Sequence, residues 1–139
     1  MEDGFARARI DPDTDERFVP LRRQLGVGSF GINQIVLRPR QRGRIHRHRE
    51  QEEVYLVLEG TLTIAIEGKE HVLERGELLR IAPDLRRQLI NAGGEPAVLV
   101  ALGGSGEHQG RDGEAFTSWD QETGAPPQET PYPDNLPAA

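Results

Sequence analysis

Short apolar or alternating runs follow one another through the middle of this sequence. Gly, Pro or Asn punctuates them at roughly eight-to-twelve-residue intervals, as in proteins built from many short strands. No segment repeats, and none shows a helical apolar period of useful length. The pattern therefore predicts an all-β sandwich or barrel. The expected strands are 31–37, 54–58, 62–66, 71–73, 78–81, 87–90 and 97–102.

Length and composition restrict the class of protein further. The chain has 139 residues, which is enough for one domain that buries its own core. It contains no cysteine, which excludes disulfides, thiolate nucleophiles and cysteine-ligated zinc. No apolar run approaches membrane-spanning length, and residues 1–7 lack the apolar core of a signal peptide. We therefore expect a cytoplasmic protein with no membrane partner.

Basic residues cluster in one segment of an acidic chain. Six arginines lie between Arg38 and Arg49, although the net charge is −6. A surface that binds nucleic acid would extend such a cluster and interleave it with aromatic residues. This cluster contains no aromatic residue, so we expect no nucleic-acid partner.

The two ends of the chain differ in composition from its middle. Residues 1–20 form a polar arm, and residues 107–139 form an acidic tail that is rich in proline. We therefore predict one barrel domain over 21–106 with extended N- and C-terminal arms. The tail is expected to be extended by composition. Trp119 and Tyr132 are the candidates for docking it, on its own barrel or on a partner subunit.

The segment from His46 to Glu53 carries the clearest chemical signal. Residues two apart on a strand point to one side, so His46 and His48 converge. If the chain then bends back, Glu53 approaches the same point from the neighbouring strand. Two histidines and a carboxylate are the ligands typical of non-haem iron and related divalent sites. A charged, solvated edge is the alternative, but the following run, Val54–Leu58, is too apolar for a surface loop.

Beyond this triplet, the spacing resembles the two sequence motifs of the cupin superfamily, G-x5-H-x-H-x3,4-E-x6-G and G-x5-P-x-G-x2-H-x3-N. The matching residues are His46, His48, Glu53 and Gly60 in the first motif and Gly76, Pro83 and Asn91 in the second. The first glycine of the first motif is displaced, and the turn in the second motif differs slightly in length. The resemblance covers roughly residues 32–102. It implies a double-stranded β-helix, the cupin jelly-roll barrel, with the triplet pointing inwards.

The resemblance also implies a cofactor. A mononuclear divalent metal ion (Fe, Mn, Ni or Zn) would be bound by His46, His48 and Glu53, with waters completing its shell. His108, in a glycine-rich loop, is a weaker candidate for a late ligand. Tyr55, two residues beyond Glu53, is the nearest candidate for a proton donor and a ligand contact.

The third histidine of the family pattern is missing from this sequence. Its place is taken by Arg87, or by Gln88 if the strand register slips by one residue. Arginine stays protonated and has no lone pair to give to a metal. Arg87 could turn outwards to a surface acid, or it could pair with Glu53 in a metal-free salt bridge. As a third alternative, it could anchor a bound carboxylate or phosphate whose other end meets the metal.

Two functions follow from these patterns. The first is a small-molecule-binding cupin with a divalent metal, acting as a metal-dependent oxygenase or isomerase. The alternative is a non-catalytic, metal-free cupin that binds or senses a small ligand, for which an anion is one option. Val54, Leu56 and Leu58 share a second apolar face that needs a cover, either from the N-terminal strand or from a second subunit. We therefore also predict a homodimer.

Overall fold

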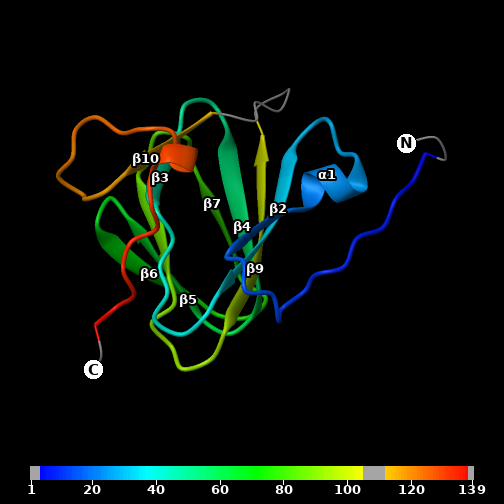
Figure 1. Ribbon diagram of the computed structural model, residues 1–139, viewed down its shortest axis with the longest axis horizontal. Helices are drawn as coiled ribbons and strands as arrows, with labels where there is room; N and C mark the ends of the chain where they lie inside the picture. Colours follow the sequence, from blue (N-terminus) through cyan, green and yellow to red (C-terminus); the bar gives the residue numbers. More distant parts are fainter. Residues whose placement is uncertain (1–3, 105–111, 138–139) are drawn as a thin grey trace.

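Two five-stranded antiparallel sheets face each other in the computed structural model, which describes residues 4–104 and 112–137 (Figure 1). The first sheet, in spatial order, contains β1 (Phe18–Pro20), β2 (Gly31–Leu37), β9 (Ala97–Gly104), β4 (Glu52–Glu59) and β7 (Leu78–Ile81). The second contains β10 (Gly113–Phe116), β3 (Ile45–His48), β8 (Arg87–Ile90), β5 (Leu62–Ile66) and β6 (Lys69–Leu73). The predicted double-stranded β-helix is confirmed.

Helix is scarce in this part of the chain. One short helix, α1 (Leu21–Leu25), ends at Gly26, whose positive φ of 72° closes the last turn. A single 3-10 turn, η1 (Pro127–Glu129), lies in the C-terminal tail. Among the described residues, no helix is long and apolar enough to cross a membrane.

The apolar core lies between the sheets because one face of each strand points inwards. On β4, Tyr55 and Val57 are buried, while Leu56 between them is only half-buried. Leu99 on β9 and Ile64 on β5 are fully buried against them. This parity on β4 is the one that the sequence predicts, and it also turns Glu53 inwards.

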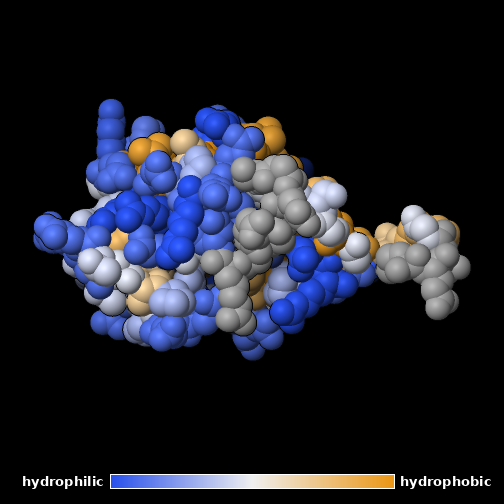
Figure 2. Space-filling model, turned by 90° about the horizontal axis from the view of Figure 1, so that it is seen from above, coloured by the Kyte–Doolittle hydropathy of each residue, from blue (hydrophilic) through white to orange (hydrophobic). Residues whose placement is uncertain are grey.

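The opposite face of the first sheet carries the predicted second apolar surface. Leu56 and Val100 face each other across β4 and β9, and Gln34 of β2 continues the same row. The N-terminal arm reaches this row, where the backbone of Asp11 exchanges hydrogen bonds of 2.6 and 2.9 Å with the Gln34 side chain. Residues 4–10 run away from the barrel, and Phe5 is 72% exposed (Figures 1 and 2). The arm therefore covers only one side of this surface, and the homodimer stays a prediction.

The C-terminal tail docks on the barrel of its own chain. Three alternate residues of the basic cluster, Arg40, Arg42 and Arg44, donate side-chain hydrogen bonds to tail carbonyls. The acceptors are Leu136, Asp134 and Thr130. The cluster that resembles a basic surface in the sequence therefore holds down the acidic tail.

Tyr132 also fixes the tail, because its ring lies under the guanidinium groups of Arg17 and Arg44, at 4.5 and 4.0 Å from the ring centre. Trp119, the other predicted anchor, is half-buried, and its carbonyl accepts a hydrogen bond from Arg86. The strand β10 lies beyond the predicted barrel boundary at residue 106 and pairs with β3.

Gly60 marks the turn between β4 and β5, and it tests this packing. Its φ is +75°, and an added Cβ would lie 2.2 Å from the carbonyl oxygen of Pro96. We expect Gly60→Ala to lower the free energy of unfolding in urea by at least ~3 kcal/mol, since strain and backbone overlap add together. Gly68 has a similar φ of +82° but nothing within 4 Å, so Gly68→Ala should cost only about 1 kcal/mol. Equal losses in the two variants would contradict the close approach.

Candidate metal centre

Two strands from opposite sheets bring the predicted triplet together. His46 and His48 are alternate residues of β3 and turn to the same side, while Glu53 points inwards from β4. The Glu53 Oε1 atom lies 3.5 Å from His46 Nε2 and 3.3 Å from His48 Nε2. Among the described residues these three form the one group of His, Cys, Asp or Glu side chains that could hold a metal ion. His108 lies outside the described residues.

Hydrogen bonding fixes the tautomer of His46, but it leaves the protonation of His48 open. His46 Nδ1 lies 3.2 Å from the carbonyl oxygen of Arg44, which can only accept, so Nδ1 carries the proton and Nε2 of a neutral ring carries a lone pair. Neither ring nitrogen of His48 has a hydrogen-bond partner among the described residues, although both are buried. The ring nitrogens and the carboxylate oxygen therefore repel one another unless a positive centre lies between them. Either a proton on a histidine or a metal ion supplies that centre.

The distances from Glu53 Oε1 to the two histidine Nε2 atoms are compatible with a bound metal ion. Two ligand atoms at about 2.1 Å from one ion lie about 3.0 Å apart at a right angle and about 3.4 Å apart in a tetrahedron. The observed distances of 3.3 and 3.5 Å are close to the second value. The donor set, two imidazoles and one carboxylate, leaves positions open for water or a ligand.

Arg87 faces inwards and binds Glu53. It lies directly opposite His46 in the pairing of β8 with β3, and its side chain is fully buried. Its Nη2 donates to Glu53 Oε1 at 2.8 Å, and its Nη1 donates to the carbonyls of Leu85 and Pro83 at 2.6 and 3.1 Å. The outward-facing alternative is therefore wrong, and the pairing with Glu53 is the one observed. A guanidinium in this place disfavours a metal cation compared with a third histidine.

The surroundings of Glu53, Tyr55 and Arg87 fix the protonation state of each group. In the metal-free state, burial alone would raise the pKa of Glu53, but hydrogen bonds and positive charge from His46 and His48 hold it well below its usual range. Burial and the negative charge of Glu53 raise the pKa of Tyr55 well above its usual value. Burial would lower the pKa of Arg87, but the interactions with Tyr55 and Glu53 outweigh it and raise this pKa. The Tyr55 hydroxyl therefore stays protonated, and it donates a hydrogen bond of 2.6 Å to Glu53 Oε1.

A cavity of about 850 Å³ opens beside this cluster. His46, His48, Glu53 and Tyr55 lie on its wall, together with arginines of the N-terminal segment and residues 124–129 of the tail. The residues on its wall include neither Arg87 nor Gln88, whose side-chain amide donates to the carbonyl of Gly43 at 3.1 Å. The ligand-binding roles of Tyr55, Arg87 and Gln88 stay predictions.

Sequence reasoning missed the contribution of the tail to this wall. The one signal for it is the alternation of Arg40, Arg42 and Arg44, which points three guanidinium groups towards the same segment.

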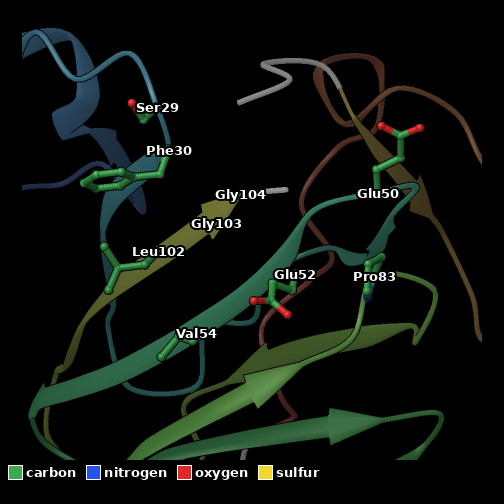
Figure 3. A pocket seen from close by; sticks show the side chains of 9 residues that line it. All are labelled: Ser29, Phe30, Glu50, Glu52, Val54, Pro83, Leu102, Gly103 and Gly104. Carbon is green, nitrogen blue, oxygen red and sulfur yellow. The ribbon is translucent and has the colours of Figure 1, made fainter. Parts of the chain in front are cut away.

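A second hollow lies near the outer face of the first sheet (Figure 3). It is lined by Phe30, Val54 and Leu102, with Glu50 and Glu52 towards its other side. Glu52 is already paired with Arg80 at 2.7 Å, and no histidine lines the hollow. The cavity beside Glu53 is therefore the better candidate for a functional site.

Comparisons with known proteins agree with this architecture. Residues 33–103 match the family model of the cupin domain (Cupin_2). A cupin-superfamily sugar phosphate isomerase from Silicibacter pomeroyi is 23% identical, with a TM-score of 0.63 over 85% of this chain and 81% of that one. A cupin protein from Bacteroides fragilis is 24% identical, with a TM-score of 0.65 over 85% of this chain and 95% of that one.

A further solved structure is the Cupin_2 domain of an XRE family transcriptional regulator from Enterobacter cloacae. It is 23% identical, with a TM-score of 0.57, and the match covers 64% of this chain and 97% of that one. At these identities the structural similarities show the fold alone. No curated protein matches the sequence significantly.

The buried pair of Arg87 and Glu53 makes a direct prediction about stability. Arg87→Met leaves the Glu53 carboxylate buried without its guanidinium, and we expect the free energy of unfolding to fall by about 3–5 kcal/mol. Arg80→Met is the matched control, because its pair with Glu52 has a similar distance but side chains that are 60% and 53% exposed. That variant should lose about 1 kcal/mol or less. Similar losses in both variants, measured by urea unfolding, would show that the buried pair is not structurally important.

Proposed function

Because this chain belongs to the cupin family, we propose that it binds a small molecule inside the barrel, beside a divalent metal ion held by His46, His48 and Glu53. The observation that carries the proposal is the convergence of three acceptor atoms, with both nitrogens of the buried His48 lacking a hydrogen-bond partner among the described residues. The adjoining cavity of about 850 Å³ lies within the range of sites for small ligands.

The bound metal would act as a Lewis acid that polarises a substrate oxygen. The chain's own residues would hold the ligands in place. The carbonyl of Arg44 fixes the tautomer of His46, and Arg87 and Tyr55 together fix the carboxylate of Glu53. Since the Tyr55 hydroxyl already donates a hydrogen bond to Glu53, we assign Tyr55 a positioning role.

Among reaction classes we favour an isomerase acting on a hydroxylated small molecule, with a metal-dependent oxygenase second. The structurally similar protein from Silicibacter pomeroyi is described as a sugar phosphate isomerase, which supports this choice by analogy.

A metal-free binding protein is the second candidate, and one observation favours it. Arg87 Nη2 lies 2.8 Å from Glu53 Oε1, so the carboxylate already has a cationic partner. A protonated histidine could supply the remaining positive charge. The similar cupin domain of a transcriptional regulator would then be the closer functional analogy, with ligand binding as the output.

Metal binding separates these two candidates. We expect protein purified without an affinity tag to bind about one equivalent of Mn²⁺, Fe²⁺, Ni²⁺ or Zn²⁺ in equilibrium dialysis followed by elemental analysis. The His46→Ala/His48→Ala double variant should bind less than a tenth of that amount at the same free metal concentration, because it loses two of the three ligands.

His71→Ala provides the control, since His71 is an exposed residue of β6 and should not affect metal content. The same proteins can be assayed for aldose–ketose interconversion and for oxygen consumption. The metal proposal would be refuted if the wild-type protein bound no stoichiometric metal and its metal content equalled that of the double variant.

A substitution at Arg87 should increase metal affinity instead of lowering it. Arg87→His removes a cation and adds a third imidazole opposite His46, so we expect metal affinity to rise at least tenfold in isothermal titration calorimetry. Gln88→His is the matched control, because its side chain lies outside the wall of the cavity and should leave the affinity unchanged. Unchanged affinity in a folded Arg87→His protein would mean that residue 87 does not face the metal.

A further inference from the structure

The wall of the main cavity is rich in positive charge although the chain is acidic, with a net charge of −6. Five arginines and no lysine line it, and among the described residues none of the five forms an ion pair with a carboxylate. They are Arg17, Arg22, Arg23, Arg44 and Arg49. Such a concentration of one sign in a concave site raises the local concentration of anions.

The carboxylates of the same wall do not balance these arginines. Glu53 is paired with Arg87, and Glu114 is paired with Arg47 at 2.8 Å, and neither of those arginines is among the lining residues. Asp112 is 8% exposed, and its Oδ2 accepts backbone N–H groups from residues 49–51. Glu129 is the remaining carboxylate on the wall. The cavity therefore has an excess of positive charge.

Two of these arginines are held in place by contacts with the tail and the barrel. Arg17 and Arg44 stack on the ring of Tyr132, and each donates one hydrogen bond to a backbone carbonyl, of Arg42 and Thr130 respectively. Most donors of both guanidinium groups are not used by the described residues. A fixed guanidinium loses little side-chain entropy when it binds an oxyanion.

Arg22 differs from these two, because its Nε is buried and has no acceptor among the described residues. The short helix α1 carries Arg22 and Arg23 to the cavity wall. A buried charged donor without an acceptor is costly, and an anionic ligand is one means of satisfying this side chain.

We propose that the ligand of this cavity is a phosphorylated small molecule, whose phosphate is held by Arg22, Arg44 and Arg17. Its unphosphorylated end would then lie towards the His46, His48 and Glu53 cluster. The inference rests on the proposed function, and it adds the substrate class and the residues that select it. A phosphate monoester is favoured over a carboxylate because it carries nearly two negative charges near neutral pH and binds several guanidinium groups at once. Arg87 is not among these residues, since it does not line the cavity and both of its Nη atoms already donate to Glu53 or to the 82–85 turn.

Calorimetry with glucose 6-phosphate, inorganic phosphate, glucuronate and glucose tests the proposal on the full chain, freed of metal by a chelator. We expect both phosphate compounds to bind at least tenfold more tightly than glucuronate or glucose. Arg22→Gln should weaken phosphate binding at least fivefold, while Arg75→Gln, an exposed arginine that does not line the cavity, should have no effect.

The His46→Ala/His48→Ala variant distinguishes this proposal from the metal site. Phosphate binding should persist in that variant, even if the wild-type protein binds no metal. Three results would overturn the proposal: glucuronate binding as tightly as glucose 6-phosphate, an Arg22→Gln protein that binds phosphate as well as the wild type, or loss of phosphate binding in the double histidine variant alone.

Discussion

One oxygen atom, Oε1 of Glu53, connects the two sheets of the barrel. Glu53 and Tyr55 come from β4 in the first sheet, whereas His46 and Arg87 come from β3 and β8 in the second. Arg87 and Tyr55 donate hydrogen bonds to this oxygen, and the two histidines of β3 lie within 3.5 Å of it. Apart from the cavity, most of the buried side chains between the sheets are apolar, and they fix no particular register by themselves. A buried polar cluster fits only one alignment, because every misaligned state would leave a charge without a partner.

The arginine at position 87 changes what this cluster can do. With a histidine in its place, the site would be an assembly of acceptors, and stability would depend on a bound metal. With Arg87, the carboxylate of Glu53 is paired with a permanently charged side chain of the same chain. We therefore expect the barrel to fold without metal, and any metal ion would have to bind against the repulsion of the guanidinium.

Local patterns in the sequence predicted much of this structure. β2, β5, β7 and β8 begin and end at the predicted residues, because each is an apolar or alternating run bounded by turn residues. The inward direction of Glu53 followed from the parity of β4. The pairing of Arg87 with Glu53 was one of three open alternatives, since the sequence gives no information about which buried charges meet. Tyr132 was a predicted anchor of the tail, but the sequence left open whether the tail docks on its own barrel or on a partner subunit. The contacts of Arg40, Arg42 and Arg44 could not be predicted, because they bind backbone carbonyls, which every residue has.

The candidate metal centre and the arginines of the cavity wall come largely from different parts of the chain. The segment that matches the cupin domain, 33–103, contains the whole His46, His48 and Glu53 cluster. It contains neither Arg17 nor Arg22, and it also lacks Tyr132 and the tail residues that complete the wall of the cavity. Membership of the family therefore accounts for the candidate metal centre but says nothing about the charge of the ligand. Of the three proposed phosphate ligands, Arg44 lies inside the matched segment, whereas Arg17 and Arg22 lie before it. We therefore propose that the ends of the chain contribute most of the selectivity for the ligand.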